Sequence, residues 1–177
     1  IGSNKDQYTA LGQDFHTRGA RCDEQLLLLK SLLSQEKVSF SGRWDTVENS
    51  GISPKPIQSN IPIWYGGASI PGERVINRIA RHADGWFVLC NPEDYDGIRK
   101  KIDEAAIKAA RDPSTIKTEA GVAVVGPRES EWQSRVINWS AMGLDYICLR
   151  TLGGDLTPQQ HLDELAEVVP EALQIIS

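Results

Sequence analysis

The chain has 177 residues, of which 40% are hydrophobic and 24% charged, a balance typical of one globular domain. Its 19 Lys and Arg stand against 24 Asp and Glu, giving a formal net charge of -5, and no basic run could neutralise a series of phosphates. This composition argues against a nucleic-acid-binding protein. The longest apolar stretches, such as residues 26–29, are far short of the roughly 20 residues that span a bilayer, so we expect a soluble cytoplasmic protein.

The first third of the chain predicts one helix followed by an irregular segment. Leucines at helical spacing indicate a helix of about fourteen residues around residues 25–33, with Asp23 and Glu24 in its first turn. Residues 38–44 alternate as a strand does, and residues 53–58 must be extended because prolines disfavour helix before them. Residues 38–60 are therefore expected to form an irregular insertion. The chain starts with Ile1, and residues 1–4 resemble the tail of a strand, so we expect it to begin within a fold.

From residue 61 onward the pattern becomes regular. Strands are predicted at residues 61–65, 85–90, 120–125 and 146–149, and helices at residues 73–83, from Pro92 to before Asp112, at 129–142 and from Thr157 to about residue 175. This alternation predicts four βα units with parallel strands. Each strand is interpreted as apolar throughout, as strands buried on both faces are. An open doubly wound sheet and half of an eight-stranded barrel both fit this periodicity.

The turn Gly66-Gly67-Ala68-Ser69 is the best candidate binding site. It follows a parallel strand at its carboxyl end, where ligands of both α/β architectures bind, and a helix begins shortly after it. Two glycines let backbone N–H groups approach a ligand, and the helix N-terminus attracts an anion. The segment thus predicts a phosphate cradle, and the alternative is a plain strand-to-helix turn.

Other chemically capable residues receive no catalytic role. His16 and His82 each stand apart in sequence from any serine or cysteine nucleophile. Asp84 precedes a strand, which places it at the end of the sheet associated with stability. The charged stretch at residues 15–24 is interpreted as a solvated helix start. The three cysteines, Cys22, Cys90 and Cys148, are widely spaced, which predicts reduced thiols in the core and no metal site.

Six segments resemble one known family when they are taken in order. They are residues 8–15 (YTALGQDF), 18–24 (RGARCDE), 38–42 (VSFSG), 54–58 (PKPIQ), 61–67 (IPIWYGG) and 81–86 (RHADGW). This series is similar to that of the bacterial luciferase-like monooxygenases. The resemblance implies a TIM (β/α)8 barrel, of which residues 1–177 form the C-terminal portion, from the end of strand four through helix eight, in one domain incomplete at its N-terminus.

The resemblance also implies a function. It predicts an oxidoreductase or monooxygenase that acts on a small organic substrate with reduced FMN or the deazaflavin coenzyme F-420, whose phosphate is held by Gly66, Gly67, Ala68 and Ser69. Where several relatives carry a histidine and a tyrosine on the flavin, this chain has Phe15 and Gly19, and the arginine-glycine form of the segment favours the deazaflavin branch.

Further expectations concern partners and alternatives. A separate flavin reductase and a homo-oligomer are expected partners, and the catalytic residues are left unassigned. The alternative functions are a non-catalytic half-barrel that binds flavin or serves assembly, and a phosphate-binding open α/β domain without redox chemistry.

Overall fold

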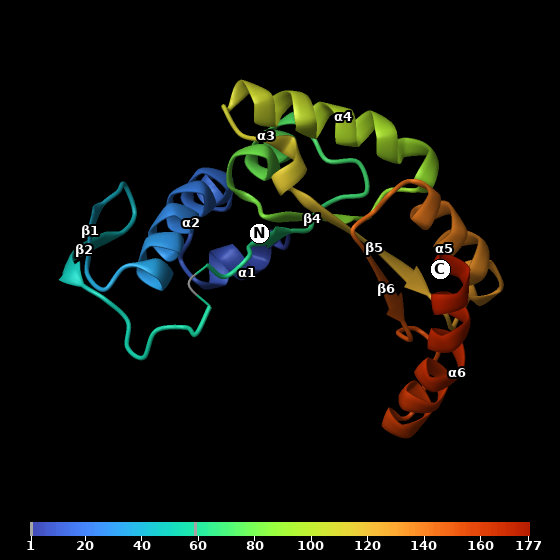
Figure 1. The fold of residues 1–177 in the computed structure, drawn as a ribbon. Helices are drawn as coiled ribbons and strands as arrows, with labels where there is room; N and C mark the ends of the chain where they lie inside the picture. Colours follow the sequence, from blue (N-terminus) through green and yellow to red (C-terminus); the bar gives the residue numbers. More distant parts are fainter. Residues whose placement is uncertain (1, 59) are drawn as a thin grey trace. The chain divides into compact units, whose positions relative to one another are not determined.

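The computed structural model describes residues 2–58 and 60–177, which form two compact units, residues 1–63 and 64–177 (Figure 1). The N-terminal unit contains α1 (Lys5–Ala10), the 3-10 turn η1 (Phe15–Thr17), α2 (Arg18–Ser34), and an antiparallel hairpin of β1 (Val38–Ser41) and β2 (Thr46–Ser50). The single strand predicted at residues 38–44 is thus half of a hairpin. A strand tail is expected at residues 1–4, of which Ile1 lies outside the described residues. Asn4 is instead the N-cap of α1, and its side chain accepts a hydrogen bond from the backbone N–H of Asp6.

Glu24 on α2 holds the turn of this hairpin. Its carboxylate accepts hydrogen bonds from the backbone N–H groups of Arg43, Trp44 and Asp45, at 2.7, 2.9 and 3.1 Å. Burial opposes ionisation of Glu24, but these hydrogen bonds outweigh it and keep its pKa below the ordinary value. A Cβ on Gly42 would collide with the same carboxylate, so a larger residue there would have to displace it. The predicted helix start lies within α2, and Glu24 there has the further role of holding this turn.

The C-terminal unit contains the four βα units. Its elements are β3 (Trp64–Tyr65), α3 (Glu73–His82), β4 (Gly85–Val88), α4 (Pro92–Lys108), η2 (Pro113–Thr115), β5 (Lys117–Ala123), η3 (Glu129–Glu131), α5 (Trp132–Ala141), β6 (Tyr146–Arg150) and α6 (Pro158–Ile176). The strands pair in the order β3-β4-β5-β6, and every pairing is parallel. The predicted alternation is confirmed, and the order is that of consecutive strands in a barrel wall.

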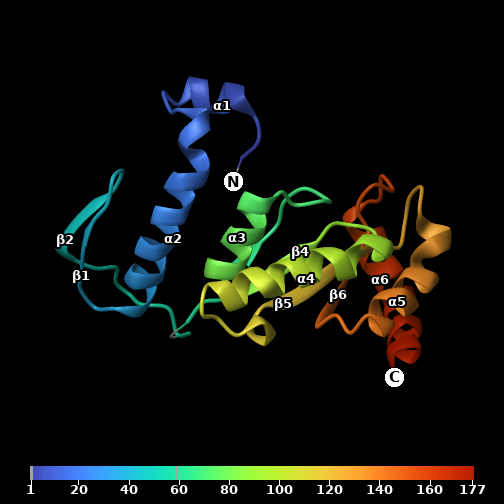
Figure 2. The ribbon, with the colours of Figure 1, turned by 90° about the horizontal axis from the view of Figure 1, so that it is seen from above.

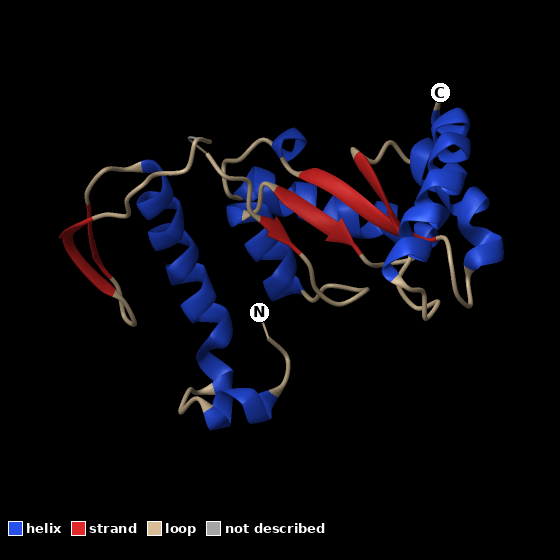
Figure 3. Cartoon of the chain, turned by 90° about the horizontal axis from the view of Figure 1, so that it is seen from below, coloured by secondary structure: helices blue, strands red, loops and turns tan. Residues whose placement is uncertain are grey.

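The helices of this unit cover one face of the sheet. Figure 2 shows α3 and α4 over the strands, and Figure 3, from the opposite side, shows the strands in front of them. Burial agrees: Thr118, Ala120 and Val122 of β5 are buried, whereas the intervening Glu119 and Gly121 are half-exposed. The interpretation of the strands as apolar on both faces is therefore wrong, because alternate side chains point to a face that no helix covers.

The uncovered face is concave. The rings of Trp64 on β3 and Tyr146 on β6 approach to 5.8 Å between centroids, although these are the two outer strands. Three strand spacings in a flat sheet come to about 14 Å. The sheet must therefore curl toward its uncovered face, as a barrel wall does and a doubly wound sheet with helices on both faces does not.

The core lies between the sheet and its helices. Trp86 of β4 stacks on Tyr95 of α4 at 5.9 Å between centroids, and Tyr95 meets Trp139 of α5 edge-on. Ile79, Ile102, Val122, Val136 and Trp139 have fully buried side chains. These contacts attach α3, α4 and α5 to one side of the sheet and leave the other side open.

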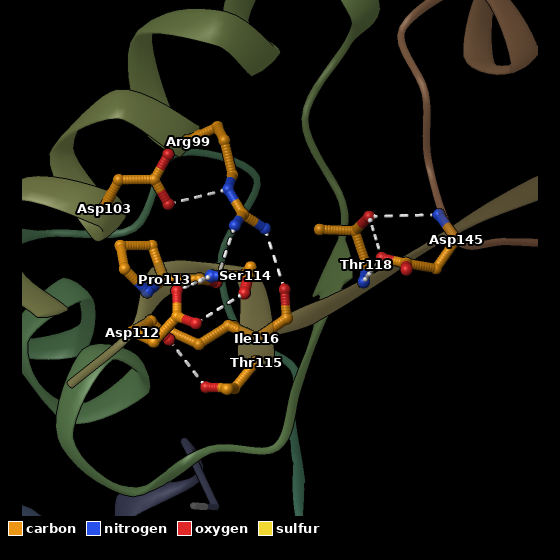
Figure 4. A network of polar contacts seen from close by, with 9 residues as sticks. All are labelled: Arg99, Asp103, Asp112, Pro113, Ser114, Thr115, Ile116, Thr118 and Asp145. Carbon is orange, nitrogen blue, oxygen red and sulfur yellow. Dashed lines mark hydrogen bonds and ion pairs between the residues drawn. The ribbon is translucent and has the colours of Figure 1, made fainter.

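A polar network closes the amino-terminal end of the sheet (Figure 4). Arg99 of α4 donates to the carbonyl oxygens of Ile116 and Pro113, at 2.8 and 2.9 Å, and its Nε pairs with Asp103 at 2.8 Å. Asp145, just before β6, accepts from the backbone N–H and the hydroxyl of Thr118 on β5. These contacts fix the ends of the sheet opposite to the predicted binding site.

The three cysteines lie in different surroundings. Cys90 is buried, and burial raises its pKa. Cys148 is exposed, so its predicted position in the core is wrong. The reason is that side chains alternate along β6, and Cys148 points to the face that no helix covers. Within the described residues, every helix is too short or too polar to cross a bilayer.

Candidate functional site

Gly66, Gly67, Ala68 and Ser69 form an exposed loop between β3 and α3. The loop follows the carboxyl end of β3, and because the sheet is parallel this end lies beside the carboxyl ends of β4, β5 and β6. This is the edge at which α/β barrels place their ligands. The structure thus brings the four predicted residues together at the expected edge, and whether they bind a ligand stays a prediction.

The fold itself does not require glycine at positions 66 and 67. A Cβ on Gly66 would lie 3.7 Å from the ring of Phe87, and a Cβ on Gly67 would lie 3.8 Å from Cγ1 of Val75, both ordinary van der Waals contacts. Neither glycine has a positive φ. The two residues therefore leave space on the loop that a larger side chain would fill, as expected where a ligand approaches the backbone.

The helix after this loop has an open N-terminus. Gly72 is the N-cap of α3, and no side chain caps it. By contrast, α6 is closed by its own capping box, in which Gln160 N donates to Thr157 Oγ1 at 3.4 Å and Thr157 N donates to Gln160 Oε1 at 2.8 Å. Val75 N donates to Gly72 O at 2.9 Å, so the N–H groups of Glu73 and Arg74 and the positive dipole end of α3 are the parts that could meet an anion, with the carboxylate of Glu73 as an opposing charge.

The loop borders the concave face of the sheet. Gly66 lies against Phe87, whose ring is 5.2 Å from that of Trp64. Phe87, Leu89 and Tyr146 are 37%, 46% and 54% exposed, which is high for large apolar side chains on a sheet. The arrangement places an exposed backbone loop at the rim of the concave face, and aromatic side chains form the floor of that face beside it.

Within the C-terminal unit, Asp84 and His82 lie outside this loop. Asp84 precedes β4, and its carboxylate lies 3.7 Å from Arg111, so it belongs to the amino-terminal end as predicted. His82 is in the last turn of α3. In the N-terminal unit, Phe15 packs edge-on against Tyr8 beneath the guanidinium of Arg18, and Gly19 is inside α2.

One polar residue on the concave face was missed. Arg150 ends β6 with Tyr146 and Cys148 on the same side of the strand. The period of two at residues 146–150 is the signal that could have found it, but all four strands were interpreted as apolar. Among the described residues, no group of three or more His, Cys, Asp or Glu side chains could hold a metal ion.

A parallel sheet in consecutive strand order, covered by helices on one face and curled toward the other, is a segment of an α/β barrel. The family described as "Luciferase-like monooxygenase" matches residues 1–172. The chain therefore belongs to the luciferase-like monooxygenase family, and its fold is that of the TIM-barrel structures of that family.

Individual relatives extend this comparison. The chain is 26% identical over 137 residues to an FMNH(2)-dependent dimethylsulfone monooxygenase of Pseudomonas putida, covering 75% of this chain and 36% of that protein. It is 29% identical over 164 residues to a phthiodiolone/phenolphthiodiolone dimycocerosates ketoreductase of Mycobacterium kansasii, covering 87% and 44%. The solved structure of an F420-dependent secondary alcohol dehydrogenase with an F420-acetone adduct superposes with a TM-score of 0.70 at 15% identity, covering 96% of this chain and 66% of that one. The chain thus spans less than half of the length of these curated relatives.

Proposed function

We propose that this chain is the cofactor-phosphate-binding part of a luciferase-like oxidoreductase that acts on a small organic substrate with reduced FMN or coenzyme F-420. The observation that carries the proposal is the exposed Gly66–Ser69 loop, which leads into the uncapped N-terminus of α3. Relatives named for FMNH(2) and for F420 both occur among the similar proteins, and both cofactors contain a phosphate.

Different parts of the chain bind the phosphate and line the concave face. Backbone N–H groups of Gly66 and Gly67 and of the first turn of α3 hold the phosphate, and Ser69 adds a hydroxyl donor. The apolar floor of Trp64, Phe87 and Tyr146 excludes water from the concave face. When bound, the cofactor supplies the redox chemistry, which is monooxygenation with reduced FMN or hydride transfer with F420. With FMN, a separate reductase supplies the reduced flavin.

Thermal denaturation with different cofactors tests this function. In the protein expressed from its natural reading frame, the favoured cofactor at 100 times its Kd is expected to stabilise the fold by about 2.7 kcal/mol. Riboflavin, which lacks the phosphate, serves as the control and is expected to stabilise it less than FMN does. If neither FMN nor F420 raises the melting temperature, or if FMN raises it and riboflavin raises it as much, the proposal is wrong.

The open sheet also predicts that residues 1–177 alone associate with further copies. The outer edges of β3 and β6 carry no neighbouring strand within the described residues. Beside β6 lies an apolar cavity of about 330 Å³, lined by residues that include Ile147, Leu149, Leu165 and Val169. Unpaired edges and exposed apolar surface favour association. Light scattering of the isolated segment is expected to show dimers or larger species, and a stable monomer that turns over substrate would contradict this.

A further inference from the structure

The guanidinium of Arg150 is built into the concave face of the sheet. Arg150 lies across β5, where its Nη2 is 3.4 Å from the carbonyl oxygen of Gly121. A Cβ on Gly121 would lie 2.5 Å from Nε and 2.6 Å from Cζ of Arg150, so only glycine leaves room for this position. Gly121 pairs with Cys148, two residues before Arg150. The side chain therefore leans back over the sheet, and Gly121 forms a slot that holds it.

Most of the hydrogen-bonding capacity of this guanidinium is unused. It has five N–H donors, and the carbonyl of Gly121 is at the long end of hydrogen-bond distance. In the part of the chain that the structure describes, no carboxylate forms an ion pair with Arg150. The acidic residue on the same face of β5 is Glu119. It lies two residues before Gly121, and therefore further from the carboxyl edge of the sheet.

Two further arginines, Arg128 and Arg135, lie close enough to Arg150 to form a group with it. Arg128, in the loop after β5, forms an ion pair with Glu131, in which Nη2 lies 2.7 Å from the carboxylate. The pKa of Arg135 on α5 is lowered, chiefly by burial and then by the positive charges of Arg128 and Arg150. The carboxylates of Glu131 and Glu93 raise this pKa but do not outweigh the lowering. Arg150 is the member of this group that faces the concave side with its charge unpaired.

This position is distinct from the phosphate cradle. The N-terminus of α3 follows β3, an outer strand of the sheet, whereas the guanidinium of Arg150 lies on the uncovered side against β5. A phosphate held by α3 is thus not the group that Arg150 meets. A guanidinium that opens onto an aromatic floor suits a second, smaller anion, because its planar fork binds two oxygens of an oxoacid side by side.

We propose that Arg150, positioned by Gly121, binds the acidic head group of the substrate, so that the enzyme takes organic oxoacids, carboxylates or sulfonates, rather than neutral molecules. This inference rests on the function proposed above. The apolar remainder of the substrate lies on the floor of Phe87 and Tyr146, and the bidentate contact orients it toward the cofactor.

Calorimetric titration of the cofactor-loaded protein with butyrate, methanesulfonate and neutral butyramide tests the proposal without an activity assay. The wild type is expected to bind at least one of the two anions at least tenfold more tightly than butyramide, and the stronger anion identifies the head group. Arg150→Gln is expected to weaken anion binding at least tenfold and to leave cofactor affinity unchanged. Gly121→Ala, which displaces the guanidinium, is expected to act in the same direction.

Matched controls separate the possible failures. Arg128→Gln removes an arginine whose charge is already paired and is expected to change anion binding less than twofold. If the wild type binds butyramide as well as both anions, or if Arg150→Gln weakens the cofactor rather than the anions, the proposal is overturned. If the wild type does not bind the cofactor at all, the proposed function itself fails, and the two failures are thus distinguishable. The wild-type comparison decides even if the variants do not fold.

Discussion

Replacing Gly67 with valine is expected to lower the affinity of the protein for its phosphate-bearing cofactor about 100-fold while the ligand-free fold persists. That loss corresponds to about 2.7 kcal/mol, which is one or two hydrogen bonds to a charged group. The valine methyl groups occupy the space through which backbone N–H groups of the loop approach the phosphate. Folding changes little because a Cβ at this position makes only an ordinary contact, 3.8 Å from Val75.

Fluorescence titrations with FMN and riboflavin measure this effect. The Gly67→Val variant is expected to lose affinity for FMN and to retain most of its weaker affinity for riboflavin. Gly97→Val is a matched control, because Gly97 lies on α4 with open space around it. Unchanged FMN affinity in Gly67→Val would show that the phosphate binds elsewhere.

Replacing Asp145 with alanine is expected to destabilise the C-terminal unit by about 2 kcal/mol, because it leaves a buried donor unpaired. Thr118 is only 1% exposed, and its backbone N–H donates to Asp145 Oδ2 at 2.8 Å. The other carboxylate oxygen pairs with Lys117 at 2.8 Å, a more exposed contact that contributes less. Urea denaturation is expected to show a lower midpoint with an unchanged slope, whereas Asp96→Ala on the exposed face of α4 is expected to change little.

The same carboxylate gives a pH dependence with a definite sign. Burial works against ionisation of Asp145, but the hydrogen bonds from Lys117 and Thr118 outweigh it and lower its pKa. A carboxyl group whose pKa is lower in the folded state stabilises the fold above its unfolded pKa of about 3.9, and this contribution is lost as the pH falls below that value. The stability difference between the wild type and Asp145→Asn is therefore expected to be constant from pH 7 to 5 and to shrink below pH 4. A difference that grows on acidification would contradict this account.

The N-terminal unit shows where local patterns mislead. Residues 38–44 alternate as one strand does, but the structure turns at Gly42 because Glu24, eighteen residues earlier, binds the N–H groups of residues 43–45. In the second half the strand predicted at residues 61–65 is reduced to Trp64–Tyr65. In each case the pairing partner, rather than the intrinsic pattern, decides how far a strand extends.

The alternation of strands and helices after residue 60 follows from local signals in the chain, namely helical periodicity, the start of α3 at Glu73 and the proline that opens α4. The sequence also located the Gly66–Ser69 turn, since the glycines and the helix that follows are adjacent in the chain. The face of the sheet that the helices cover depends on tertiary packing, and this packing leaves Tyr146, Cys148 and Arg150 on the opposite face. The contact between Arg150 and Gly121 joins residues that are 29 positions apart in the chain. Such a contact depends on strand register and sheet curvature, which arise from the pairing of distant segments and leave no local pattern in the chain.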